Sequence, residues 1–380
     1  MPAPQKPERR VITHGAPMLP DPIRLATLMQ EAIAVSWFSN GGQLHQRLER
    51  ALGDMAGDGA LALVSSGTMA LMLALRLGDL PEGSEVITSP LSFAATVQAI
   101  AWCGFRPVFA DVEPATLTLC PRAVEAAITP RTAAILPVHF LGVPCDVAGL
   151  ADVARRHGLW LAYDAAHAFG VTLGNQPIAA FGDASAFSLH ATKVLHTGEG
   201  GFVATGGDKV LAKLRRLKNF GLEGGRMTGL GINGKLSEAQ AAMGLALLPD
   251  LPAEIAARHA LRTRYDAALA GLPGIRPGPG RKGASPALTT YALRMAPGLR
   301  ARLHLALAEE RVLARDHFPL LCGSGSPWAD VPIVTADGAP IAPRVGPEVL
   351  CLPFHGRVAD EDADRICMII RRVAYEEGQA

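Results

Sequence analysis

Between residues 61 and 204 short apolar runs alternate with segments of helical spacing, and this alternation limits the fold more than any other feature. Strands that alternate with helices at this spacing indicate an α/β domain, in which helices cover both faces of a mostly parallel sheet. The expected strands are 61–64, 85–88, 107–110, 133–138 and 159–163, and the expected helices between them are 68–77, 93–102, 121–128 and 147–157.

The length of the chain, 380 residues, favours two domains, because one hydrophobic core rarely serves so many residues. A long helical pattern over 252–269 is followed by a run dense in Pro and Gly over 272–286, where we expect the domain transition. We therefore predict a large α/β domain over residues 1–255, which includes an extended N-terminal arm, and a smaller C-terminal α/β domain over residues 256–380.

The charge balance excludes several classes of partner. Lys and Arg total 36 and Asp and Glu total 35, without a long run of either sign, which argues against nucleic acid and against a membrane surface. The N-terminus has no apolar signal core, so we expect a cytoplasmic protein. The six cysteines are widely scattered, which favours reduced thiols over a metal site.

Lys193 is the candidate nucleophile. It lies between the apolar run 184–187 and the pair Gly200-Gly201, which leads into the apolar run 202–204, a pattern of strand, tight loop and strand. Partial desolvation at the edge of a sheet favours the neutral amine, which forms an imine with a carbonyl group. An ordinary surface lysine is the alternative.

Three other features point to one ligand. Asp164 follows an expected strand at the end that faces the ligand crevice of a parallel sheet, although it could instead cap a turn. The segment Ser66-Gly67-Thr68 opens an expected helix and could bind an anion, or simply provide the N-cap. Phe93 could stack on a planar ligand or lie in the core.

Two other patterns carry less weight. Asp164 and His167 suggest a metal or a triad, but no third ligand and no nucleophile elbow accompanies them. The segment 229–236 matches G-x-G-x-x-G, yet no apolar strand precedes it, so we do not expect a dinucleotide or phosphate loop there.

An imine-forming lysine, a carboxylate at a strand end, an anion site and an aromatic platform are together what pyridoxal 5'-phosphate (PLP) requires. The chain resembles the sugar-nucleotide aminotransferases of the DegT/StrS family, most strongly from about residue 37 to 265. The segments that carry the resemblance are 66–68, 85–88, 109–112, 137–139, 163–167, 188–201 and 231–238.

The resemblance implies a PLP enzyme of fold type I that works as a homodimer with shared active sites. It implies that Lys193 carries the cofactor and moves the proton, that Asp164 pairs with the pyridine nitrogen, that His167 lies near the ring hydroxyl and that Phe93 stacks on the ring. The implied phosphate ligands are Gly67, Thr68, Met69 and Ser188, with Asn233 from the partner subunit.

The implied reaction is transamination, in which L-glutamate donates the amino group and a nucleotide-linked keto-sugar accepts it. The form of residues 188–193 is most similar to the branch that makes 4-amino-4,6-dideoxy sugars from 4-keto-6-deoxy precursors. Amination at carbon 3, a dehydrating enzyme and a non-enzymatic regulatory protein are the alternatives. The family's dehydratases have His in place of Lys193, which argues against a dehydrating enzyme. The pairs Gly41-Gly42 and Gly234-Lys235 depart from the family pattern, so the identity of the sugar stays open.

Overall fold

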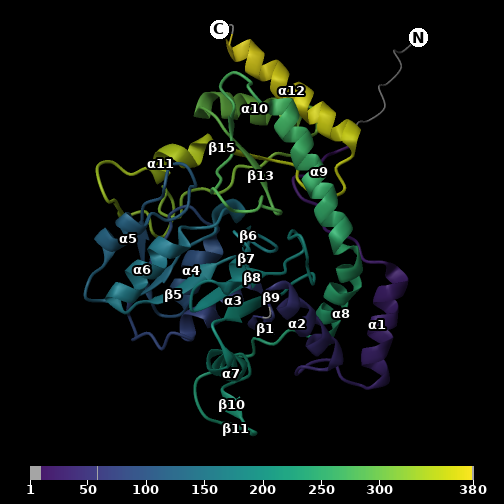
Figure 1. Cartoon of the computed structure of the whole chain (residues 1–380), viewed down its shortest axis with the longest axis vertical. Coiled ribbons are helices and arrows are strands. Elements are labelled where there is room, and N and C mark those ends of the chain that lie inside the picture. The colour runs from purple at the N-terminus through teal and green to yellow at the C-terminus, as the bar shows by residue number, and fades with distance from the viewer. Residues whose placement is uncertain (1–9, 58, 379–380) are drawn as a thin grey trace.

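The computed structural model describes residues 10–57 and 59–378 and is built around an eight-stranded sheet in the order β1-β9-β8-β5-β4-β2-β3-β14 (Figure 1). The neighbours from β8 to β14 are parallel, whereas β9 is antiparallel to both β8 and β1. The predicted α/β class with a mostly parallel sheet is therefore confirmed. The strands of this sheet are β1 Ala60–Val64, β2 Glu85–Thr88, β3 Arg106–Ala110, β4 Thr132–Leu136, β5 Trp160–Asp164, β8 Ala184–Ser188, β9 Gly201–Thr205 and β14 Ile333–Val334.

Helices cover both faces of the sheet, because its strands are apolar on both sides. In β1, Leu61 and Leu63 pack into the same core as α1, α2 and α8, whereas Ala62 and Val64 pack into the core beneath α3, α4 and α7. Two further helices, α5 and α6, cover the other half of the sheet. These helices are α1 Pro22–Ala34, α2 Gln43–Met55, α3 Gly67–Arg76, α4 Ala94–Trp102, α5 Pro121–Ala127, α6 Val147–His157, α7 Asp208–Leu217 and α8 Glu238–Leu247.

Several helix ends are fixed by local sequence. Asp146 caps the start of α6 by accepting the Gly149 N–H, and Gly158 ends the same helix in the left-handed conformation. Ser237 and Gln240 form a capping box at the start of α8. The sequence pattern placed most helix bounds to within two residues because these caps are encoded locally.

The C-terminal part of the chain forms a second core around the three-stranded sheet β12-β13-β15 (Figure 1). Residue Ile12 of the N-terminal arm forms a parallel bridge with Val312 and is buried in this core. Residues 1–9 of the predicted arm lie outside the described residues. The elements here are α9 Leu251–Leu269, β12 Arg276–Pro277, β13 Tyr291–Arg294, α10 Pro297–Glu309, α11 Ala342–Val345, β15 Val349–Leu352 and α12 Asp360–Gly378.

Three short pairings were not predicted from the sequence. The C-terminal strand β14 pairs with β3 at the edge of the large sheet, so the chain crosses back after residue 256. The proposed boundary between residues 255 and 256 stays a prediction. A hairpin of β10 Leu222–Glu223 and β11 Arg226–Met227 lies in the loop that joins α7 to α8, and β6 Thr172–Leu173 pairs with β7 Gln176–Pro177.

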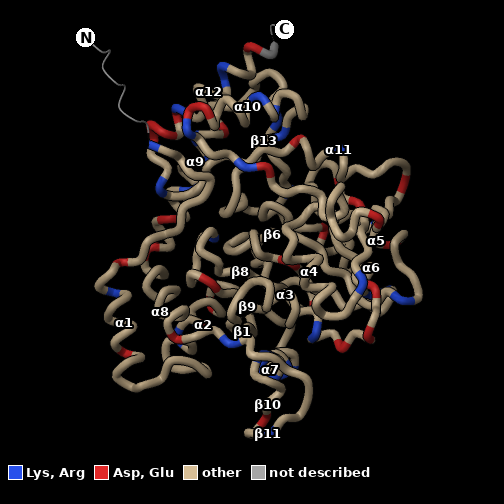
Figure 2. Tube along the Cα trace, turned by 180° about the vertical axis from the view of Figure 1, so that it is seen from behind, with Lys and Arg blue, Asp and Glu red and all other residues tan. Residues whose placement is uncertain are grey.

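Basic and acidic residues are interspersed over the molecule (Figure 2), in keeping with the nearly even charge balance of the sequence. Among the described residues, no helix is long and apolar enough to cross a membrane. The cytoplasmic location expected from the sequence stays a prediction.

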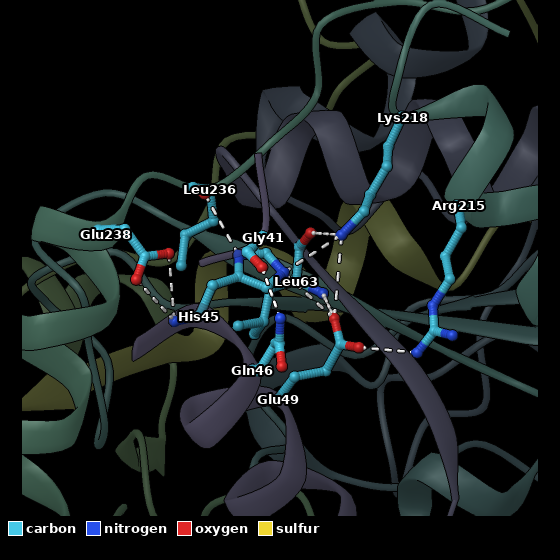
Figure 3. Close-up of polar contacts among 9 residues, drawn as sticks. All are labelled: Gly41, His45, Gln46, Glu49, Leu63, Arg215, Lys218, Leu236 and Glu238. Atoms are coloured by element: carbon cyan, nitrogen blue, oxygen red, sulfur yellow. Dashed lines mark hydrogen bonds and ion pairs between the residues drawn. The ribbon is translucent and has the colours of Figure 1, made fainter. Parts of the chain in front are cut away.

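Glu49 on α2 connects α2 with α7 and with β1, the strand at one end of the sheet order (Figure 3). Its carboxylate accepts hydrogen bonds from Arg215 on α7 at 2.9 Å and from the backbone N–H of Leu63 on β1 at 3.2 Å. Lys218 lies 3.9 Å from the same carboxylate and donates to the Leu63 carbonyl at 2.8 Å. Burial acts to raise the pKa of Glu49, but the hydrogen bond from His45 and the charge of Lys218 outweigh it, and the pKa falls to about 2.

We expect Glu49→Gln to lower the free energy of unfolding by about 3 kcal/mol, because it leaves Lys218 buried without its counter-charge. Because the pKa of Glu49 is lowered from 4.5, this carboxylate stabilises the fold above pH 4.5, and the contribution is lost as the pH falls toward 2. Urea unfolding measures the change. Glu31→Gln removes an exposed ion pair with Arg47 and is the control, with an expected loss below about 1 kcal/mol. Equal losses in the two variants would contradict the prediction.

Candidate active site

The loop that carries Lys193 connects two antiparallel strands, β8 and β9, and hydrogen bonds hold it closed. The N–H of Leu189 donates to the Gly200 carbonyl, that of Ala191 to Gly198, and that of Lys193 to His190. Gly201 is required at the base of the loop, since a Cβ atom there would lie 2.6 Å from the Phe187 carbonyl oxygen. The predicted order of strand, loop and strand is confirmed. The hydrogen bonds of the loop fix the backbone position of Lys193.

The amine of Lys193 has the electrostatics of a nucleophile. Burial lowers its pKa from 10.5 to about 8, and the negative charge of Asp164 opposes this shift. A lysine with this pKa has a substantial neutral fraction near neutral pH. Burial at this position therefore favours the neutral amine, and the role of Lys193 as the nucleophile stays a prediction.

Asp164 ends β5 and is 5 % exposed. One carboxylate oxygen accepts the Thr96 hydroxyl at 2.7 Å, and the other accepts the backbone N–H of Ala166 at 3.1 Å. The pKa of Asp164 is raised, because burial outweighs these two hydrogen bonds and the charge of Lys193, which act to lower it. The aspartate is thus oriented on both oxygens and interacts electrostatically with the lysine.

The start of α3 lies beside the Lys193 loop. A Cβ atom at Gly67 would lie 2.9 Å from the Cβ of Ser188, so only glycine allows this close approach. Ser66 caps the helix by accepting the Met69 N–H at 3.1 Å, as the alternative interpretation of this segment predicted. The amides of Gly67 and Thr68 remain at the positive end of the helix, where an anion is favoured.

Aromatic side chains from distant parts of the chain surround His167. Phe93 precedes the first turn of α4, is 57 % exposed, and lies 5.5 Å from the Phe318 ring. The ring of Phe318 stacks on His167 at 5.8 Å. Burial lowers the pKa of His167 well below its usual range, and the charge of Lys193 adds to the shift. An exposed Phe93 favours the stacking role over a place in the core.

The structure adds residues that the sequence pattern missed. Ser92 and Thr96, four residues apart at the start of α4, lie behind Asp164. His14 of the N-terminal arm and His317 of the C-terminal region contact each other through their Nε2 atoms at 3.0 Å, and His317 lies 6.5 Å from the His167 ring. Ser92 and Thr96 could have been found from the sequence, because they lie four residues apart beside the candidate Phe93. No sequence pattern connects His14 with His317, which are 303 residues apart.

Asn233 is exposed and lies on the loop between the β10-β11 hairpin and α8. Its backbone pairs with Asn219, and the next residue, Gly234, accepts the Ser65 N–H. The loop follows the exposed β10-β11 hairpin rather than a buried strand, which agrees with the rejection of its glycines as a dinucleotide motif. The role of Asn233 toward a partner subunit stays a prediction.

The residues present fit PLP. An oriented carboxylate suits a protonated pyridine nitrogen, the lysine suits an aldehyde, and the glycine-lined start of α3 suits a phosphate. The exposed Phe93 offers an aromatic face.

Comparison with known proteins identifies a family of aminotransferases. The model of the DegT/DnrJ/EryC1/StrS aminotransferase family matches residues 24–371. The chain is 33 % identical to a dTDP-4-amino-4,6-dideoxy-D-glucose transaminase of Escherichia coli, over 93 % of this chain and 96 % of that protein. It is also 33 % identical to a UDP-N-acetyl-3-dehydro-alpha-D-glucosamine 3-aminotransferase of Acidithiobacillus ferrooxidans, over 82 % and 83 %.

A solved structure extends the similarity to three dimensions. The crystal structure of DesI in the presence of its TDP-sugar product superposes with a TM-score of 0.91 at 33 % identity, covering 98 % of this chain and 95 % of that one. The predicted fold type and the predicted resemblance are confirmed.

The lowered pKa of Lys193 predicts a pH profile. When PLP is added to the apoprotein, the rate at which the visible absorbance of the bound cofactor appears should rise through pH 8, because only the neutral amine reacts. Asp164→Asn should move the midpoint below 8, because the carboxylate raises the pKa of Lys193.

Lys218 is the matched control for this experiment, since burial also lowers its pKa to about 8. Lys193→Ala should abolish the absorbance change, and Lys218→Arg should preserve it. A midpoint near 10.5 in the wild-type protein would contradict the prediction.

Proposed function

The chain belongs to the DegT/DnrJ/EryC1/StrS aminotransferase family, and on this basis we propose that it is a PLP-dependent transaminase of nucleotide sugars. It takes the amino group of L-glutamate and transfers it to a nucleotide-linked 4-keto-6-deoxyhexose, giving a 4-amino-4,6-dideoxy sugar nucleotide. The observation that carries the proposal is the place of Lys193 on the loop after β8, where it interacts electrostatically with Asp164, the buried carboxylate that ends the neighbouring parallel strand β5.

Bound PLP supplies an electron sink next to the carbon that exchanges its amino group. The residues of the chain do the rest. Asp164 keeps a proton on the ring nitrogen, and Lys193 Nζ accepts and returns the proton of the reacting carbon. Phe93 covers the ring, and His167, whose pKa is lowered, stays neutral near the ring hydroxyl.

The phosphate binds at the start of α3. Gly67 and Thr68 offer backbone N–H groups there, and Ser188 offers its hydroxyl from the end of β8. Met69 was predicted as a fourth ligand, but the Ser66 hydroxyl takes its N–H. We therefore propose that Met69 completes the helix turn that orients the amides of Gly67 and Thr68.

Amination at carbon 4 is favoured by the relative from Escherichia coli, whose name records a 4-amino-4,6-dideoxy product. The relative from Acidithiobacillus ferrooxidans is a 3-aminotransferase at the same identity, so amination at carbon 3 is the second candidate. Lys193 itself opposes a dehydrating enzyme, because the resemblance implies histidine at that position in the dehydratases.

We propose a homodimer in which Asn233 contributes to the partner's site. Asn233 is exposed, and large apolar residues on the same loop and on the adjoining hairpin are also exposed, namely Phe220, Met227, Leu230 and Ile232. A cluster of exposed apolar residues on one segment marks a surface for another protein. A second copy of the chain would cover it and place Asn233 in the shared site.

The product identifies the reaction. We expect the purified protein with PLP, L-glutamate and a nucleotide-linked 4-keto-6-deoxyhexose to give a sugar nucleotide with nitrogen at carbon 4, located by NMR spectroscopy. Lys193→Ala should reduce the rate by at least about a hundredfold, because it removes the proton carrier. Nitrogen at carbon 3 would overturn the choice of carbon and leave the aminotransferase assignment standing.

Mixed dimers test the shared site. We expect Lys193→Ala and Asn233→Ala each to be nearly inactive alone and to regain partial activity when co-expressed as differently tagged subunits. In the mixed dimer one site has both wild-type residues, because Lys193 and Asn233 come from different subunits. A mixed dimer as inactive as its parents would refute the contribution of Asn233 across the interface.

A further inference from the structure

Behind Asp164, on the side of α4, two hydroxyl groups form a continuous chain of hydrogen bonds. The Thr96 hydroxyl lies 2.7 Å from one carboxylate oxygen of Asp164, and the Ser92 hydroxyl lies 2.6 Å from the Thr96 hydroxyl. All three side chains are buried: Thr96 is not exposed at all, Ser92 is 2 % exposed and Asp164 is 5 % exposed. Solvent therefore does not compete for these contacts.

The direction of the chain follows from counting hydrogens. An ionised carboxylate only accepts, so Thr96 donates its one hydroxyl hydrogen to Asp164. The contact between Ser92 and Thr96 then requires Ser92 to donate to the Thr96 oxygen. Both hydroxyl groups therefore donate in the direction of the carboxylate. In such a chain each hydrogen bond polarises the next and strengthens it.

This direction opposes the effect of burial. Burial in an apolar surrounding favours the neutral carboxylic acid, which could not hold a proton on the ring nitrogen of PLP. Hydrogen bonds donated to a charged oxygen favour the ionised form and are shorter and stronger than neutral ones. Thr96 supplies one such bond and the Ala166 N–H supplies the other.

We propose that Thr96 and Ser92 are positioning residues of the active site, which hold Asp164 ionised and in one orientation for the pyridine nitrogen of PLP. The inference rests on the proposed function, because it needs PLP at Asp164. Both residues flank Phe93, whose carbonyl accepts the Thr96 N–H at 3.2 Å. The start of α4 thus positions Asp164 for the ring nitrogen of PLP and Phe93 for the face of the ring.

The test compares two cofactors bound to the full-length apoprotein. PLP has a pyridine nitrogen, whereas 1-deaza-PLP has a CH group in its place and the same aldehyde and phosphate. Titration followed by visible absorbance gives both dissociation constants. We expect Thr96→Val, which replaces the hydroxyl with a methyl group of similar size, to weaken PLP binding roughly ten- to hundredfold, because it removes a hydrogen bond to a charged group. Binding of 1-deaza-PLP should be unchanged, since it makes no use of an ionised Asp164.

Two further variants locate the effect. Thr96→Ser keeps the hydroxyl and should bind PLP within a few fold of the wild-type protein. Ser92→Ala leaves Thr96 in place but removes its donor, so it should weaken PLP binding less than Thr96→Val and with the same selectivity for PLP. If Thr96→Val fails to fold, as judged by circular dichroism, Ser92→Ala still decides between the outcomes.

Thr88→Val is the matched control. Thr88 is equally buried and donates its hydroxyl to the Leu136 carbonyl at 2.7 Å, outside the chain that reaches Asp164. This variant should bind both cofactors like the wild-type protein. If Thr96→Val or Ser92→Ala weakened the binding of PLP and of 1-deaza-PLP equally, these residues would serve packing only, and the proposal would be wrong. If both variants bound PLP as tightly as the wild-type protein, the proposal would also be overturned. A wild-type protein that binds neither cofactor would instead refute the proposed function.

Discussion

A carboxylate and an amine of opposite charge, Asp164 and Lys193, are both removed from water at one edge of the sheet, and the rest of the site depends on them. Burial disfavours the charged form of each group, while each charge favours the ionisation of the other. At Asp164 two donated hydrogen bonds favour the ionised form and so oppose the effect of burial, which raises its pKa. Within residues 10–57 and 59–378 no hydrogen bond supports the charged form of the Lys193 amine, and burial lowers its pKa, which favours the neutral amine.

The sheet brings these groups together through the direction of its strands. β5 and β8 are parallel neighbours, so Asp164 and Ser188 end at the same edge. β1 is antiparallel to β9, as is β8, so the start of α3 after β1 lies at that edge too. One strand pattern therefore places the Asp164 carboxylate, the start of α3 and the Lys193 loop at the same edge of the sheet.

The parts of the site predictable from sequence are those with a local signature. Lys193 and Gly67 come shortly after a strand and Asp164 ends one, so the fold class fixes the edge of the sheet at which all three lie. Thr96 gave only a weak signal, and its contact with Asp164, 68 residues away, depends on how α4 packs. His14 and His317 meet only because the arm pairs beside Val312.

The sequence by itself determined the alternation of strands and helices, the ends of most helices and the chemistry that residues at strand ends can perform, because periodicity, caps and glycines act within a few residues. Tertiary structure alone decided which hydroxyl groups support Asp164, that His317 interacts electrostatically with Lys193, and that β14 returns to the large sheet. These contacts join residues far apart in the chain, and their geometry depends on packing between elements that no local pattern records.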